Sequence, residues 1–229
     1  MSNNNENAEV KQNMETEDKL KELGIPGFLG TKNNIQFISL IGEVEGHNLS
    51  SANIKTTKYE HIIPLLINSQ QDPKIEGVFI ILNTVGGDVE AGLALSEMIK
   101  GLSIPTISLV LGGGHSIGIP LATSTDYSII VPTATMTVHP IRTTGLVIGA
   151  AQTFRYFEKM QQRISKFILG TSKIDKDTLN QLMYATDQLA NDIGTILVGK
   201  EAVDIGLIDE VGNFSYALNK LKVMIANNK

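Results

Sequence analysis

The sequence lacks cysteine, and it also lacks an excess of positive charge. Without cysteine the chain has no disulfides, thiolate zinc sites, iron–sulfur ligands or cysteine nucleophile, which fits a reducing compartment. The 19 Lys and Arg residues stand against 24 Asp and Glu residues, for a formal net charge of −5. A mildly acidic chain does not match the basic footprint of a nucleic-acid-binding protein, so we expect no nucleic-acid partner.

Large apolar side chains are scarce at the start of the chain. Residues 1–34 are rich in Asn, Glu and Lys, and they predict a disordered or loosely attached leader. This leader has no apolar segment of the secretory kind, so the expected compartment is the cytoplasm. Residues 35–229 form one expected domain, which at this length buries enough surface to fold without a metal or disulfide.

Charge is missing from one long stretch of the chain. An even spread would place about eight Lys, Arg, Asp and Glu residues in 101–141, but this segment holds one, Asp126. Within it, residues 101–125 are long enough to span a membrane. Their prolines, hydroxyl side chains and the glycines at 112–114 argue against a lipid-exposed helix. We expect a buried strand, turn and helix in a soluble domain, with no stable membrane span.

Apolar runs of strand length alternate with amphipathic helical patterns after residue 34. Strands are expected at residues 35–41, 77–82, 106–111, 127–131, 135–138 and 207–208. Helices are expected at residues 59–68, 88–100, 116–122, 152–169, 176–185 and 216–225, with a short segment at 201–205 that ends at Gly206. This alternation predicts an α/β fold with parallel strands and right-handed crossovers.

Ser116 is the sharpest candidate for chemistry in the uncharged segment. The run LVLGGGHSIGIP at 109–120 places it after an apolar strand and a glycine-rich turn, at the start of an expected helix. Such a turn exposes the hydroxyl, and the first N–H groups of a helix face any anion formed beside it. Residues 114–118 also match the G-x-S-x-G pattern of a nucleophile elbow, a short pattern that plain tight turns share.

His139 is the candidate general base for Ser116. It ends the short apolar run TMTVHP at 135–140, inside the same uncharged segment. A neutral imidazole there can accept the proton of a serine, although a hydrogen-bonded core histidine is the commoner role. His115 is the rival, but it neighbours Ser116 on the chain, so we expect its ring to point away and to pack or line the site.

The loop NTVGGD at 83–88 follows another buried strand and precedes a helix. Its two glycines allow backbone N–H groups to approach a ligand closely, as an oxyanion hole requires. The alternative is a simple strand-to-helix turn in which Asp88 caps the helix.

These pieces together resemble the proteolytic subunit of the Clp proteases over residues 35–225, and within that family the translocation-enhancing protein (Tep) group of spore-forming Firmicutes. The motifs that carry the resemblance are GEVEGH at 42–47, LNTVGGDVEAG at 82–92, LGGGHSIG at 111–118, TMTVHP at 135–140 and GKEAVDIGLIDEVG at 199–212.

The resemblance implies a serine peptidase of the Clp/crotonase fold, which repeats β-β-α units and carries a protruding handle helix. It implies that Ser116 is the nucleophile and His139 the general base. The N–H groups of Gly87 and Ile117 map to the oxyanion hole. No cofactor or metal is implied.

The third member of the triad departs from the family pattern. A gap-free alignment back from Glu201 places Gly194 where the family has an acid. Asp192, two residues away, is our candidate for the residue that orients His139. Asp187 and Asp126 are the fallback candidates.

The resemblance also implies partners. We expect a homo-oligomeric ring of family type, heptameric and stacked through the handle helix at 152–169, acting on peptides or unfolded proteins. The leader does not match the axial loops with which processive members dock an unfoldase ATPase. We therefore expect an ATP-independent peptidase or a different partner. The group's name suggests a role near protein export or sporulation.

Other functions compete with a Clp-like peptidase. A crotonase-type acyl-CoA enzyme shares the fold but usually needs carboxylates, which are nearly absent around Ser116; a catalytically weak Clp-like scaffold also stays open. An α/β-hydrolase orders its triad as serine, acid and histidine, whereas His139 follows Ser116 by only 23 residues. A Ser–Lys peptidase would need a lysine such as Lys166 near the serine, and usually an anchor segment.

Overall fold

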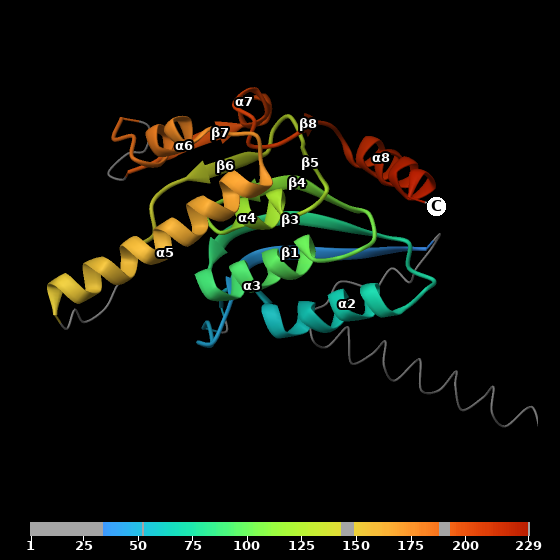
Figure 1. Cartoon of the computed structure of the whole chain (residues 1–229), viewed down its shortest axis with the longest axis horizontal. Helices are drawn as coiled ribbons and strands as arrows, with labels where there is room; N and C mark the ends of the chain where they lie inside the picture. Colours follow the sequence, from blue (N-terminus) through green and yellow to red (C-terminus); the bar gives the residue numbers. More distant parts are fainter. Residues whose placement is uncertain (1–33, 52, 143–148, 188–192, 229) are drawn as a thin grey trace, which may run out of the picture.

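The computed structural model describes residues 34–51, 53–142, 149–187 and 193–228 (Figure 1). Apart from Asn34, the expected leader at residues 1–34 lies outside the described residues. The described part is a mixed α/β structure around a sheet whose pairings are parallel with one exception, as the alternation of strands and helices predicted.

Three long parallel strands form the centre of the sheet: β1 (Ile35–Glu45), β3 (Gly77–Gly87) and β4 (Thr106–Gly114). Shorter strands extend it to the order β2-β1-β3-β4-β5-β8, and these are β2 (Thr56–Lys58), β5 (Tyr127–Ile130) and β8 (Glu210–Val211). Parallel neighbours need crossovers, and the helices supply them.

Two further strands branch from the carboxyl end of β4. β6 (Thr135–Val138) pairs in parallel with β4 through Gly113 and Thr135. β7 (Thr195–Val198) then pairs with β6 in the antiparallel sense. This branch brings the chain beyond residue 138 to the end of β4.

Helices cover both faces of the sheet. They are α2 (Tyr59–Gln71), α3 (Val89–Lys100), α4 (Gly118–Thr123), α5 (Ala150–Thr171), α6 (Lys176–Met183), α7 (Lys200–Asp204) and α8 (Phe214–Asn227). The long α5 extends away from the sheet at one side of the molecule (Figure 1). It is the protruding helix expected at 152–169.

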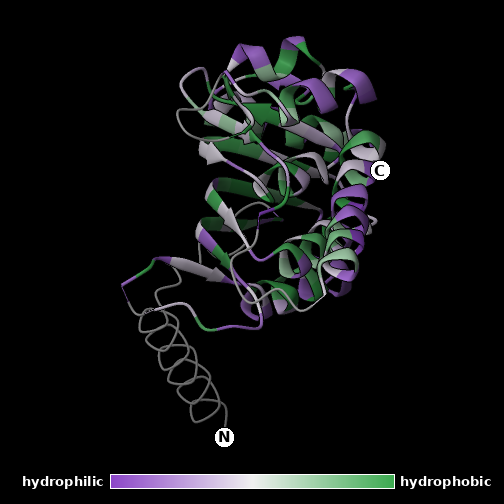
Figure 2. Ribbon diagram, turned by 90° about the vertical axis from the view of Figure 1, so that its left-hand side faces the viewer, coloured by the Kyte–Doolittle hydropathy of each residue, from purple (hydrophilic) through white to green (hydrophobic). Residues whose placement is uncertain are grey.

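Alternation along β3 divides the core. Val78, Ile80 and Leu82 join the larger cluster, which includes α2 and α3, whereas Phe79 joins the cluster beneath α8. Successive strand residues point to opposite faces, and both faces are covered, so the run GVFIIL is apolar throughout. Figure 2 shows the same distribution, with apolar residues concentrated in the strands inside the molecule.

The uncharged segment forms β4, α4, β5 and β6 in the middle of the fold, as predicted. Within the described ranges, no helix combines the length and the apolar character needed to cross a membrane.

The strand predictions differ from the structure at three places, one of which is the three-residue β2, which was not predicted. Leu207 and Ile208 are buried but not in a strand, because both of their N–H groups donate to the carbonyl of Ala202 in the middle of α7. The strand near them is β8, two residues later. β7 was missed because its four residues alternate between buried and exposed on a short edge, too brief a pattern to recognise.

The core predicts a clear difference between two phenylalanines. Phe79 is fully buried, with its ring centroid 5.4 Å from those of Phe37 and Phe214, whereas Phe154 on α5 is 70% exposed. Phe79→Ala should lower the free energy of unfolding by about 3–5 kcal/mol through lost burial and a cavity. Phe154→Ala should change it by less than about 0.5 kcal/mol. Urea unfolding measures both, and equal losses would contradict this division of the core.

Candidate active site

The candidate residues meet at the carboxyl edge of the sheet. β3 and β4 are parallel neighbours, with Thr84 opposite Gly114, so the glycine loop after Thr84 lies beside the turn that carries Ser116. β6 joins β4 at the same end, and His139 follows β6 directly. Ligand sites of parallel sheets form at this edge, because the loops that leave it converge there.

Ser116 occupies a strained turn. Its φ is +56°, and Asn34 is the only other non-glycine residue in the described part of the chain with a positive φ. A left-handed conformation costs a serine on the order of 1–3 kcal/mol and persists only where the surroundings enforce it. Gly86 makes room for this conformation, because a Cβ atom at position 86 would lie 2.8 Å from the Cβ of Ser116.

A backbone hydrogen bond ties this turn to the strand of the base. The N–H of Ser116 donates to the carbonyl of Thr137 at 3.0 Å. His139 follows Thr137 by two residues, so this bond brings the chain at His139 close to the turn of Ser116. Ser116 and His139 line one pocket of about 240 Å³, together with Gly87 and Ile117. The structure thus gathers four of the five predicted site residues.

The glycine loop contains a helix cap, and one of its glycines lines the pocket. Asp88 caps α3, since its carboxylate accepts from the N–H of Ala91 at 2.8 Å. Gly87 has a φ of +147°, and a side chain there would collide with the backbone of Val44 in β1. Only glycine therefore lets the loop pass this close to β1 while its backbone lines the pocket.

Thr84 fixes the conformation of this loop. Its hydroxyl donates to the carbonyl of Gly42 at 2.6 Å and accepts from the N–H of Gly86 at 3.1 Å. The side chain is 1% exposed, so these bonds act without competition from water. Sequence reasoning did not single out Thr84, although a hydroxyl directly before a Val-Gly-Gly turn is a local signal for such a bond.

His139 lines the pocket, and one nitrogen of its ring has a defined hydrogen-bond partner. Its Nδ1 lies 2.7 Å from the carbonyl oxygen of Pro140. A carbonyl only accepts, so this bond places the proton of a neutral ring on Nδ1. Nε2 then carries the lone pair that a general base requires.

The predicted third member of the triad is not placed. Asp192 lies outside the described residues. Gly194 does lie beside the base, because a Cβ atom there would be 2.8 Å from the Cβ of His139. Its φ of +131° and the carbonyl of Val138 leave no room for a side chain.

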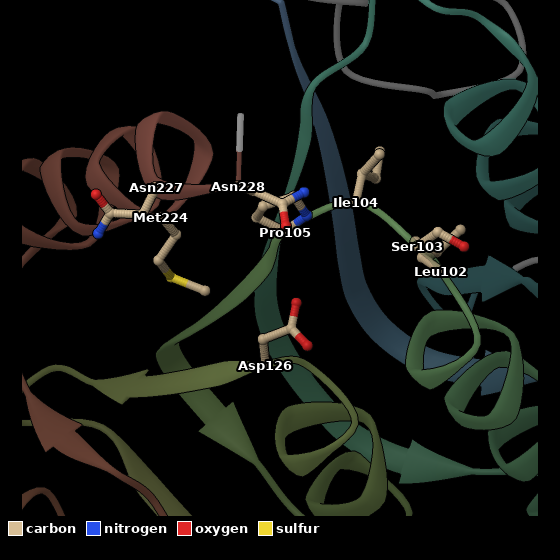
Figure 3. Close-up of a pocket in the computed structure, with 8 residues that line it drawn as sticks. All are labelled: Leu102, Ser103, Ile104, Pro105, Asp126, Met224, Asn227 and Asn228. Atoms are coloured by element: carbon tan, nitrogen blue, oxygen red, sulfur yellow. The ribbon is translucent and has the colours of Figure 1, made fainter.

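The described lining of the pocket includes neither fallback acid. Asp187 is an exposed residue of the segment between α6 and β7. Asp126 accepts from the N–H and the hydroxyl of Thr106, at 2.8 and 2.9 Å, at the amino end of β4. Figure 3 shows its carboxylate in a separate pocket, near Pro105 and the end of α8. Ser116 follows the opposite end of β4, so Asp126 cannot reach His139.

The lysine of the Ser–Lys alternative is also elsewhere. Lys166 lines a groove between α3 and α5 with Glu97 and Arg163, and none of these residues lines the pocket of Ser116.

His115 points away from the pocket, as expected. Its Nδ1 lies 2.7 Å from the hydroxyl of Thr137. The ring lies over Gly113, where a Cβ atom would be 2.7 Å from Nε2. Burial, reinforced by the nearby His139, lowers the pKa of His115.

Apolar side chains complete the pocket, and sequence reasoning did not assign them. They come from β3, α3, α4, β6, α5 and α6 and from the turn after β6: Val85, Val89, Ile119, Val138, Ile141, Ile164, Ile168 and Met183. Arg142 is the one cationic side chain among the described residues of the lining. The amphipathic pattern of α5 predicted a buried face but not what that face encloses.

Comparisons with known proteins show which family this chain is similar to. The model of the Clp protease family matches residues 43–214. The translocation-enhancing protein TepA of Halalkalibacterium halodurans is 51% identical over 211 residues, which cover 91% of this chain and 82% of that protein.

Clp proteolytic subunits are more distant relatives. Subunit 1 of the ATP-dependent Clp protease of Protochlamydia amoebophila is 25% identical over 143 residues, 59% of this chain and 65% of that protein. Subunit 2 of Tropheryma whipplei is 28% identical over 151 residues, 64% of this chain and 78% of that protein.

The lowered pKa of His115 predicts a pH dependence of stability. Below the ordinary histidine pKa of about 6.5, the unfolded chain binds a proton at His115, but the folded chain does not until its own lower pKa is reached. The free energy of unfolding is therefore highest above this pH and decreases as the pH falls below it. Urea unfolding at about pH 7.5 and at about pH 5.5 measures this decrease in the free energy of unfolding. Both pH values lie above the range in which carboxylates titrate. His115→Asn should reduce the loss, and an unchanged loss would mean that another group causes it.

Proposed function

The chain belongs to the Clp protease family, and from this premise we propose that it is a serine endopeptidase with Ser116 as nucleophile and His139 as general base. One observation carries the proposal: a serine in a strained turn and a histidine with an oriented ring line the same pocket as a glycine loop. This arrangement matches the requirements of acyl transfer, in which a nucleophile, a base and oxyanion donors converge on one carbonyl.

The reaction proceeds in two halves. An extended substrate adds as a strand beside the site, and Ser116 Oγ attacks the scissile carbonyl while His139 Nε2 takes its proton. The N–H groups of Gly87 and Ile117 bind the oxyanion. His139 then gives the proton to the leaving amine, and an ester to Ser116 remains. Water, deprotonated by His139, hydrolyses that ester and restores the serine.

Two groups are proposed to orient His139. The carbonyl of Pro140 holds Nδ1–H in the free protein. The imidazolium formed during attack gains more from a carboxylate, and we assign this role to Asp192. Residue 192 precedes Gly194 by two residues, a span of at most about 7 Å, and Gly194 contacts His139. We propose Asp192 rather than residue 194 for this role because position 194 has no room for an acid.

The lining favours an apolar substrate residue at the scissile bond. Nine of the described pocket side chains are aliphatic or Met, and they come from both the sheet and the helices. An apolar side chain gains from burial there, whereas a basic one loses hydration and meets the cationic Arg142 on the lining.

Family membership supports a ring of identical subunits acting on peptides or unfolded proteins. α5 fits the role of the handle between stacked rings, because Phe154 and Tyr156 are 70% and 56% exposed on its outer part. We propose action in the cytoplasm without an unfoldase ATPase. A role near protein export is proposed from the name of the TepA relative.

A catalytically weak scaffold is the second candidate, and one observation favours it. Gly194 stands where the family has its acid, and the other described acids weighed for the triad, Asp126 and Asp187, lie at the far end of β4 and on the exposed segment after α6.

Labelling of the nucleophile distinguishes the two candidates. A fluorophosphonate probe should form a covalent adduct with the wild-type protein at Ser116, because the reaction needs only the activated serine and the oxyanion site. Ser116→Ala should abolish the adduct, and a buried-hydroxyl control, Ser108→Ala, should keep it. Mass spectrometry locates the adduct. A folded, assembled wild-type protein that forms none supports the scaffold instead.

Substitution of the loop acids tests the triad. Asp192→Asn should lower kcat for a peptide substrate by about two to four orders of magnitude, since the charged base loses its partner. Asp187→Asn, an exposed change on the same segment, should leave kcat within about twofold. If Asp192→Asn retains full kcat, the carbonyl of Pro140 alone orients the base.

A further inference from the structure

His115 is a half-buried side chain next to the nucleophile for which the proposed mechanism has no role. Its ring does not line the catalytic pocket. It reaches across instead to β6, where Nδ1 lies 2.7 Å from the hydroxyl of Thr137. Because Thr137 precedes the base by two residues, this bond connects the turn of Ser116 to the strand of His139.

The same residue also contacts the strand of the oxyanion loop. The N–H of His115 donates to the carbonyl of Thr84 in β3 at 3.2 Å, and its carbonyl accepts from the N–H of Gly118 at 2.8 Å. His115 is therefore bonded to the strands that carry the oxyanion loop and the base, and to the first residue of α4.

The nucleophile turn has a particular need for such a tie. Ser116 adopts φ = +56°, a conformation that relaxes unless its neighbours oppose it. Its own N–H makes one bond to β6, with the carbonyl of Thr137. The side chain of His115 adds a second bond to the same residue. Two bonds to one residue fix the turn in rotation as well as in distance.

The local sequence makes room for this ring. A Cβ atom at Gly113 would lie 2.7 Å from Nε2 and 2.8 Å from Cδ2 of His115, so the ring occupies the space that a side chain would take. Burial lowers the pKa of His115, which keeps the ring neutral at neutral pH and adds no charge beside His139.

We propose that His115 is a positioning residue for catalysis, which ties the turn of Ser116 to the strand of His139 through the bond between its Nδ1 and the hydroxyl of Thr137. This inference rests on the proposed peptidase function. It predicts that loss of the bond moves the serine relative to the base. A shift of about 1 Å in such a pair lowers the rate of the chemical step by orders of magnitude, while substrate binding changes little.

Amide side chains give a matched pair of variants. Asparagine places a polar atom where histidine has Nδ1, so His115→Asn can keep the bond to Thr137. Glutamine places its polar atoms further out, nearer the position of Nε2, so His115→Gln loses it. On the other side, Thr137→Val removes only the hydroxyl, and Thr137→Ser retains it.

The experiment compares these variants as purified full-length proteins. We expect His115→Gln and Thr137→Val each to lower kcat for a peptide substrate at least about tenfold, with KM within about twofold. The double variant should lose no more than either single variant, because both remove the same bond. His115→Asn and Thr137→Ser should recover most of the lost rate. His61→Gln on α2, outside the catalytic pocket, serves as the control.

The rate of fluorophosphonate labelling gives a second readout that requires no peptide substrate. Thermal unfolding and particle mass check that each variant is folded and assembled; if His115→Gln does not fold, Thr137→Val, which changes one hydroxyl, carries the test.

Two outcomes overturn the inference, and they are distinguishable. A wild-type protein that labels normally, with His115→Gln and Thr137→Val labelling at the same rate, contradicts the positioning role alone. Losses that multiply in the double variant contradict it as well. A wild-type protein that neither labels nor cleaves contradicts the proposed peptidase function, and the positioning role falls with it.

Discussion

The site depends on the parallel alignment of β3, β4 and β6 at one edge of the sheet. The contact that joins them most directly is the hydrogen bond from the N–H of Ser116 to the carbonyl of Thr137. It holds a turn with an unfavourable φ against the strand that ends at His139. Both partners of this bond are main-chain groups, so a side-chain substitution can break it only by moving the strands. The apolar packing on both faces of β3 and β4 therefore stabilises the proposed catalytic geometry as well as the fold.

Glycines shape the site by what they leave out. Gly86 leaves room for the side chain of Ser116, Gly87 lets the loop pass β1, and Gly113 leaves room for the ring of His115. Gly194 bears on the proposed triad. It allows the chain to pass close to His139, and no side chain fits at this position. Close backbone approach and a side chain exclude each other at one position, so a carboxylate partner of His139 has to come from another position in the chain.

Sequence patterns predicted most of the fold for identifiable reasons. Long apolar runs such as GVFIIL allow only strands buried on both faces, and the helical stripes between them require parallel pairing. The uncharged segment was correctly placed in the core rather than in a membrane. The errors fall where a pattern is short or ambiguous. Leu207 and Ile208 are buried just after α7, and their N–H groups donate to the carbonyl of Ala202 in that helix. A buried apolar pair in the sequence does not reveal which hydrogen bonds its main chain makes. β7 alternates over only four residues.

The sequence by itself determined the local chemistry: a serine in a glycine-rich turn, a histidine at a strand end and a glycine loop before a helix. These features follow from turn and capping preferences that act over a few residues. Only the tertiary structure decided which of them meet. The branch of β6 from β4 places His139 beside Ser116 and brings Thr137 within reach of His115. The pairing of β5 with β4 places Asp126 at the far end of β4, beside Thr106. The hydrophobic pattern of a strand fixes which of its side chains face the core, but which strands become neighbours is decided by contacts between residues distant in the chain.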